Sequence, residues 1–126
     1  MTKRTHKTYK ELEALQKLDN TWCKEGRDPP NQIAIDNARK ILDFALSLNW
    51  PPSKIRASIE EGVVMFYLLI GESHYGMIIC FNDGQISAGI DSTTIEPEAW
   101  EVNTEKQGLI ATFIRLKKIF RIKSPD

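Results

Sequence analysis

The chain has 126 residues, 41% of them hydrophobic and 27% charged, a composition that is typical of one globular domain with a single core. Its 17 basic and 17 acidic side chains cancel to a formal net charge of zero, which argues against non-specific nucleic-acid binding. The longest apolar run, residues 63–70, is too short to span a membrane, and no apolar stretch of the signal-peptide type follows the basic N-terminus, so we expect one cytoplasmic domain over residues 1–126.

The first predicted helix begins with a capping box. In this motif the Thr8 hydroxyl accepts a hydrogen bond from the third helical N–H, while the Glu11 side chain reaches back to the start of the helix. Leucines and a tryptophan then recur at helical spacing, so we expect a helix from about Tyr9 to Trp22 or Cys23. A glycine and two prolines follow within eight residues and end it.

A second helix has Asn31 as its predicted N-cap, because an asparagine side chain accepts hydrogen bonds from the N–H groups of the first turn. The helix ends at the Asn-Trp-Pro-Pro segment of residues 49–52, since consecutive prolines cannot continue it. Apolar residues at helical spacing form one face that we expect to point into the core. These residues are Ile35, Ala38, Ile41, Leu42, Ala45 and Leu46.

The middle of the chain predicts an antiparallel meander of four strands separated by turns. The strands are expected at 54–59, 63–70, 75–81 and 85–91. Asn82-Asp83-Gly84 is the clearest hairpin turn, since Asp-Gly readily adopts the positive φ angles of a tight turn. The irregular stretch that follows allows a fifth short strand around 99–102.

A final helix is predicted from a second capping box, Thr104 to Gln107, to about Ile122. Lys117 falls inside its apolar arc, where the aliphatic stem can lie over the core while the ammonium reaches water. The arc consists of Leu109, Ile110, Phe113, Leu116 and Phe120. Two helices, the meander and a final helix make an α+β domain, in which helices cover one face of the sheet and the other face is left for water or for a partner.

The charges are segregated along the sequence. No lysine or arginine occurs between Arg56 and Lys106, and this segment sums to −9, while residues 1–56 sum to +4 and residues 106–126 to +5. A field of one sign attracts partners of the opposite sign, so an acidic sheet points to a basic partner. The acids are Glu60, Glu61, Glu72, Asp83, Asp91, Glu96, Glu98, Glu101 and Glu105.

No arrangement of residues predicts a cofactor, a metal site or a catalytic centre. His6, His74, Cys23 and Cys80 contain no pair at the short spacing of a structural zinc site. Cys80 lies in an apolar strand, as expected for an inert core thiol, and no histidine is placed to activate Cys23. One alternative stays open, in which acids of the meander turns bind a metal ion and serve a small hydrolase or nuclease.

Two groups of side chains suggest surfaces. Basic residues cluster at 3–10 and at 115–123 and would form a nucleic-acid patch if the two ends met in space. We do not expect this, because basic residues near the end of a helix also complement its dipole. Aromatic residues beside acids supply the contact area of a docking surface, and otherwise the tryptophans cover the ends of the core. These aromatic residues are Trp50, Trp100, Tyr67 and Tyr75.

A sparse pattern runs from the first helix into the meander. It consists of a short helix that ends in a tryptophan, a Gly/Pro-containing loop, a helix with an early isoleucine and alanine, and a proline before a plain antiparallel sheet. Here the positions are Leu15, Leu18, Trp22, Gly26, Pro29, Pro30, Ile35, Ala38, Pro52 and Gly62. In this the chain resembles a loosely defined group of small, mostly uncharacterised bacterial and phage-related proteins. The resemblance implies an α+β protein often encoded near toxin–antitoxin or defence genes, with no catalytic residues to carry over.

We therefore expect a non-enzymatic binding protein of the immunity, antitoxin or inhibitor type, which uses an acidic sheet and the 96–105 segment to bind a basic protein, for instance one that handles nucleic acid. The expected contact residues are Glu60, Glu61, Asp83, Asp91, Glu96, Glu98, Trp100 and Glu101. A second alternative is a self-assembling subunit or homodimer, in which Leu109, Phe113, Phe120 and the apolar strands pair with a second copy. The sequence leaves open whether the carboxylates face solvent or the basic terminal helices.

Overall fold

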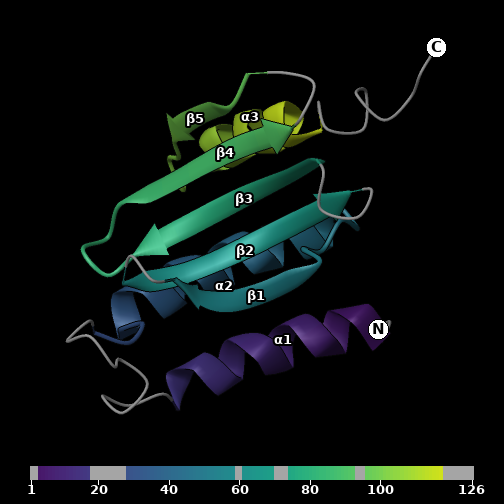
Figure 1. Ribbon diagram of the computed structural model, residues 1–126. Helices are drawn as coiled ribbons and strands as arrows, with labels where there is room; N and C mark the ends of the chain where they lie inside the picture. Colours follow the sequence, from purple (N-terminus) through teal and green to yellow (C-terminus); the bar gives the residue numbers. More distant parts are fainter. Residues whose placement is uncertain (1–2, 18–27, 59–60, 70–73, 93–95, 118–126) are drawn as a thin grey trace.

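A computed structural model of the chain describes residues 3–17, 28–58, 61–69, 74–92 and 96–117 (Figure 1). This part of the chain contains three helices and a sheet of five antiparallel strands, which confirms the expected α+β class. The helices are α1 (Lys3–Gln16), α2 (Gln32–Ser47) and α3 (Lys106–Leu116). The strands are β1 (Lys54–Ser58), β2 (Gly62–Leu69), β3 (His74–Phe81), β4 (Ile86–Ser92) and β5 (Glu98–Glu101).

The sheet is a meander in which the strands lie side by side in chain order (Figure 1). The hairpin between β3 and β4 uses the predicted Asn-Asp-Gly turn: Gly84 has a φ of 96°, and the Asp83 carboxylate accepts a hydrogen bond from the Gln85 N–H at 2.9 Å. The short fifth strand that the sequence allowed is present and pairs with β4.

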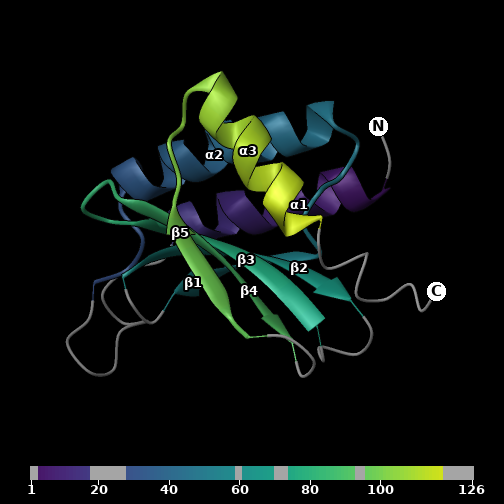
Figure 2. The same ribbon diagram turned by 90° about the horizontal axis from the view of Figure 1, so that it is seen from above.

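All three helices lie on the same side of the sheet (Figure 2). Helix α2 packs on β2 and β3, α1 contacts β1 and α2, and α3 contacts β4. In Figure 1 α1 lies beside β1 at one edge of the sheet, and α3 lies at the edge that β4 and β5 form. The opposite face of the sheet carries no helix of the described residues, and we call it the open face.

Helix α2 begins as the sequence predicts. The Asn31 side chain accepts a hydrogen bond from the Ala34 N–H at 3.0 Å, which satisfies one of the unpaired donors of the first turn. Asn31 also holds the β3–β4 hairpin: its N–H donates to Asn82 Oδ1 at 2.9 Å and its side-chain amide donates to the Asn82 carbonyl at 3.0 Å. The predicted inward positions are buried, apart from Leu46, which is half-buried against the core.

The predicted start of the first helix is wrong. Helix α1 already begins at Lys3, so Thr8 lies in its interior and is buried. The Glu11 carboxylate does not cap the helix; it accepts a hydrogen bond from the Ile55 N–H at 3.3 Å and pairs with Arg56. Glu11 thus provides a hydrogen-bond acceptor for a backbone N–H at the outer edge of β1, a tertiary role that a local motif cannot reveal. The predicted continuation to residues 22–23 lies outside the described residues.

The second predicted capping box is also wrong. The N-cap of α3 is Glu105, without a side-chain cap bond, and the Asn103 side chain in the preceding turn accepts a hydrogen bond from the Glu105 N–H at 2.8 Å. Ile110, predicted inside, is 40% exposed. Thr112 is buried in its place and accepts a hydrogen bond from Trp100 Nε1 at 3.2 Å. The remaining predicted inward residues of α3 are buried, and Phe120 lies outside the described residues.

An aromatic cluster closes the core between α2, α3 and the sheet. The Trp50 ring lies 4.4 Å from the Tyr67 ring and 5.9 Å from the Phe113 ring. The Tyr67 hydroxyl donates to the Trp50 carbonyl at 3.1 Å. Tyr67 is therefore a core residue and no part of a docking surface, and Trp50 covers one end of the core, the simpler of its two interpretations.

Candidate functional site

The open face of the sheet is apolar. Successive side chains of a strand point to opposite faces, so on β3 Ile78 is fully buried under the helices, whereas Met77 and Ile79 point to the open face and are half-buried. On β2 the same alternation directs Val64 and Phe66 to the open face, where Phe66 is half-buried and Val64 is only 7% exposed. The apolar residues of the open face on these two strands are Val64, Phe66, Met77, Ile79 and Phe81.

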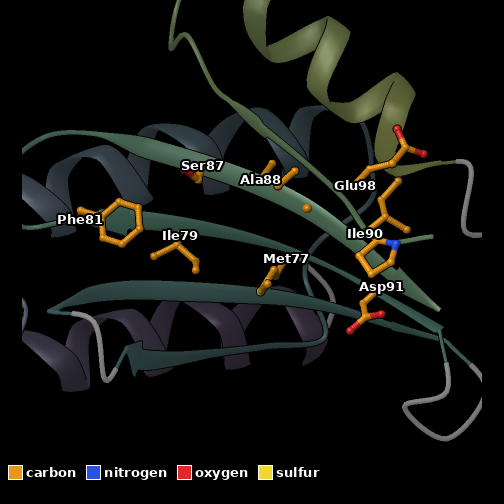
Figure 3. A pocket seen from close by; sticks show the side chains of 11 residues that line it. Met77, Ile79, Phe81, Ser87, Ala88, Ile90, Asp91 and Glu98 are labelled. Carbon is orange, nitrogen blue, oxygen red and sulfur yellow. The ribbon is translucent and has the colours of Figure 1, made fainter. Parts of the chain in front are cut away.

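A shallow groove of about 370 Å³ runs along this face over β3, β4 and β5 (Figure 3). Met77, Ile79 and Phe81 form one wall. Gly89 and Ala99, which are paired across β4 and β5, line the groove with almost no side chain. The depth of the groove therefore follows from sequence: large residues on β3 stand beside small ones on the next two strands.

One cross-strand row carries opposite charges at its ends. Arg56 on β1 is paired with Val64, Val64 with Ile79, Ile79 with Ser87, and Ser87 with Glu101 on β5. The Arg56 side chain is 53% exposed, and Glu101 is exposed at the other edge. The open face thus has a basic edge, an apolar centre and an acidic edge.

Among the predicted contact residues, Asp91 and Glu101 lie on the open face. Asp91 accepts a hydrogen bond from the Tyr75 hydroxyl at 3.1 Å, and burial together with this bond raises the pKa of Tyr75. Glu96 is exposed just before β5. Asp91 lines the groove, Glu101 is paired with the lining residue Ser87, and Glu96 directly precedes the lining residue Pro97.

The other predicted contact residues lie elsewhere. Glu61, in the β1–β2 turn, accepts a hydrogen bond from the Asp28 N–H at 3.2 Å, and Asp83 is exposed at the tip of the β3–β4 hairpin. Glu98 points toward α3 (Figure 3) and pairs with Arg115 at 3.2 Å. The same guanidinium lies 3.9 Å from the Trp100 ring centre. Glu60 lies outside the described residues.

The acidic residues of the segment therefore fall into two groups. Glu98 is neutralised internally by a basic residue of the terminal helix α3, whereas Glu101 is exposed and has no ion-pair partner within the described ranges. The apolar centre of the open face was missed by sequence reasoning. Its signal was present in the near-continuous apolar runs of β2 and β3, which are typical of strands covered on both faces.

The described residues contain no group of three or more histidine, cysteine, aspartate or glutamate side chains that could hold a metal ion. Cys80 is fully buried in the core, as its strand context predicts, and burial raises the pKa of its thiol to about 12. Such a thiol is protonated at neutral pH and inaccessible. Cys23 lies outside the described residues.

The two basic clusters do not meet in the described part of the chain. Helices α1 and α3 lie at opposite edges of the sheet (Figure 1), and residues 118–123 of the second cluster are outside the description. Leu109 and Phe113 are buried in the chain's own core, so the expectation that they pair with a second copy is wrong. None of the three helices has the length and apolar character that crossing a bilayer requires.

Comparison with protein-family models, with curated proteins and with solved structures yields no match. The resemblance to proteins encoded near toxin–antitoxin genes stays a prediction for that reason. The open face combines an apolar groove, an acidic border and a basic edge, and its chemistry is the basis for a function.

Proposed function

We propose that the chain is a non-enzymatic protein-binding module that docks its partner on the open face of the sheet. The observation that carries the proposal is the row of half-buried apolar side chains that β2 and β3 direct to a face that no described helix covers. Contiguous apolar surface that is exposed to water marks interaction sites, because solvation of such a patch is unfavourable.

The shape and lining of the groove favour a protein over a small molecule. Small-molecule sites are enclosed and place a few polar groups around the ligand. Here the groove is a shallow channel over β3–β5, with Met77, Ile79 and Phe81 on one side. A broad apolar centre with charges at its border is the usual anatomy of a protein–protein interface.

The border specifies the chemistry of the partner. Asp91 lines the groove, and Glu96 and Glu101 are next to its lining residues Pro97 and Ser87, so the partner presents an apolar patch flanked by lysine or arginine. This agrees with the expectation of a basic protein partner, and an inhibitor, immunity or antitoxin role in the cytoplasm stays part of the proposal. Charge pairs at a border of this kind accelerate association more than they strengthen the complex.

Site-specific photo-crosslinking in the native cell tests the proposal. A photoreactive phenylalanine at Ser87 lies on the open face, and one at Ile114, which is 62% exposed on α3, is the matched control on the helical side. We expect a protein adduct from position 87 that is absent from position 114. Adduct formation should fall when Glu101→Lys is added and stay constant with Asp83→Lys, an exposed acid away from the groove.

Equal adducts from both positions would contradict the proposal, as would an adduct from position 87 that is insensitive to Glu101→Lys and to a charge placed in the groove by Ile79→Asp. Circular dichroism of each purified variant shows that a lost adduct reflects a lost surface and not a lost fold.

A further inference from the structure

We infer that the partner that fits the open face is a second copy of this chain, bound face to face about a two-fold axis that runs parallel to the strands. The inference deepens the proposed function and rests on it, because it names the occupant of the same surface. A two-fold interface must be self-complementary, since residue i contacts residue j and residue j contacts residue i.

The charged row of the open face meets this requirement. Its members in order are Arg56, Val64, Ile79, Ser87 and Glu101, with β3 in the middle of the five strands. A two-fold axis along β3 reverses the row, so Arg56 of each copy faces Glu101 of the other. Ile79 then packs against its own symmetry mate at the centre, where the most strongly contributing residues of an interface usually lie.

The direction of the axis follows from charge. An axis across the strands would place β1 of one copy on β1 of the other, and Lys54 and Arg56 would face their own duplicates. Like charges placed opposite each other are unfavourable by several kcal/mol. An axis parallel to the strands places the basic edge on the acidic edge at both ends, and sheets stacked face to face prefer strand directions within about 30° of each other.

The neighbouring row provides shape complementarity. Phe66 on β2 is paired with Met77, Met77 with Gly89, and Gly89 with Ala99. Reversal of this row about the same axis places the Phe66 ring of each copy over the groove that Gly89 and Ala99 leave in the other. The large Phe66 ring thus meets the part of the groove with the smallest side chains, twice in each dimer.

Arg56 can serve in this contact although it already has a partner. Its bonds to the Glu11 carboxylate and the Ile55 carbonyl both use Nη1, and a guanidinium offers five N–H donors in a planar fork. Its side chain is still 53% exposed. The contact with Glu11 also holds Arg56 in place at the edge of the open face, which reduces the conformational entropy lost on binding.

The available area sets the expected affinity. Five strands about 4.8 Å apart and on average about 20 Å long present roughly 500 Å² per copy, so the dimer would bury about 1,000 Å² in total. This value is at the lower limit of specific interfaces. We therefore expect a dissociation constant in the micromolar range, which rises with salt because the outer contacts are charged.

Sedimentation velocity over a concentration series measures the dimer directly. We expect Ile79→Asp to raise the dissociation constant by about 100-fold or more, because it places charge on the axis, and Glu101→Arg to raise it by about 10-fold. Ile114→Asp, on the exposed side of α3, is the matched control and leaves it unchanged. A double variant, Arg56→Glu with Glu101→Arg, exchanges the two charges and should restore dimerisation that either single change weakens.

Crosslinking with a short bis-maleimide tests the direction of the axis in a Cys23→Ser background, where the remaining Cys80 is buried. A mixture of Arg56→Cys chains and Glu101→Cys chains should give 56–101 adducts between different chains. Adducts restricted to 56–56 and 101–101 would overturn the proposed axis. Because Glu101 is exposed, its substitution keeps this test valid even where a groove variant does not fold.

The outcomes separate the two proposals. A chain that sediments as a monomer at all concentrations up to about 1 mM, well above a micromolar dissociation constant, overturns the dimer. If position 87 nevertheless crosslinks to a different protein, the docking function stands with another occupant. If position 87 crosslinks to no protein, the docking function fails as well.

Discussion

Both faces of the sheet carry apolar side chains, but the described helices cover only one of them. On the helix-covered face Val63, Met65 and Ile78 are excluded from water. On the open face Phe66 and Ile79, which directly follow Met65 and Ile78 in their strands, are only half-buried. The covered face supplies the hydrophobic free energy of folding, so the apolar residues of the open face are explained better by binding than by stability.

Two adjacent isoleucines of β3 give the largest expected difference between the faces. Ile78→Ala removes a fully buried side chain and should lower the free energy of unfolding by about 4 kcal/mol. Ile79→Ala, on the open face, should lower it by about 1 kcal/mol, because its side chain is already partly in water. Urea unfolding in dilute solution, where self-association is negligible, measures both. Equal losses for the two variants would show that the open face is covered by the chain itself.

Alkaline pH offers a second way to separate the faces, because the Cys80 thiol lies in the covered core. Burial raises its pKa from 9.0 to about 12. As the pH rises above 9, the unfolded chain loses this proton before the folded chain does, so stability is full below pH 9 and falls by about 1.4 kcal/mol per pH unit toward pH 12. Between pH 9 and 11 the loss should reach about 2 kcal/mol.

The control for this prediction is Cys80→Ala, which removes the titrating group and should flatten the pH dependence between 9 and 10. The pKa values of Tyr9 and Tyr75 are also raised, so they add a decline of the same sign above pH 10 in both proteins. An unchanged slope in the Cys80→Ala variant would mean that the thiol is accessible to water in the folded state.

Local sequence signals were sufficient for much of this fold. The strands of the meander, the Asn-Asp-Gly hairpin and the Asn31 cap each depend on residues close together in the chain, and each lies within a residue or so of its predicted place. Helix starts failed where distant contacts decide. Glu11 bonds to Ile55 and Arg56 on β1, and Thr112 bonds to Trp100, so tertiary bonds replaced the local motifs.

The candidate site could be predicted only in part. The cation-free segment brought Asp91 and Glu101 into consideration, but alternation alone does not say which face the helices cover. Strand register decides that Glu101 joins a row of the open face while Glu98 points toward Arg115. The apolar centre was missed because runs such as residues 63–70 appear as core strands whether or not a second layer covers them.

The residues at the starts of α2 and α3 should contribute differently to the stability of the fold. Asn31→Ala removes both the cap of α2 and one of the bonds to Asn82, and it should cost about 2 kcal/mol. Thr104→Ala lies one residue outside the N-cap of α3 and should change stability by less than about 0.5 kcal/mol. Thermal or urea unfolding of the two variants measures the difference. A larger loss of stability for Thr104→Ala than for Asn31→Ala would mean that the Thr104 side chain does cap α3.

The smallest expected effect concerns the edge where the two faces meet. Arg115 lies on the Trp100 ring and pairs with Glu98, but its side chain is 40% exposed, so water screens the charge and most of the contribution is packing on the ring. Arg115→Ala should therefore lower stability by about 1 kcal/mol. Lys117→Ala, whose ammonium lies 6.0 Å from the Trp50 ring, is the matched control and should cost less than about 0.5 kcal/mol.

Charge and packing at this edge are separated by Arg115→Met, which keeps a long apolar side chain over Trp100. It should recover more than half of the loss seen with Arg115→Ala if packing dominates, and urea unfolding at two salt concentrations should then show little dependence on ionic strength. If Arg115→Met is as unstable as Arg115→Ala, the ion pair with Glu98 carries the contribution. In that case the ion pair between Glu98 and Arg115 stabilises the fold more than the solvent exposure of its two side chains suggests.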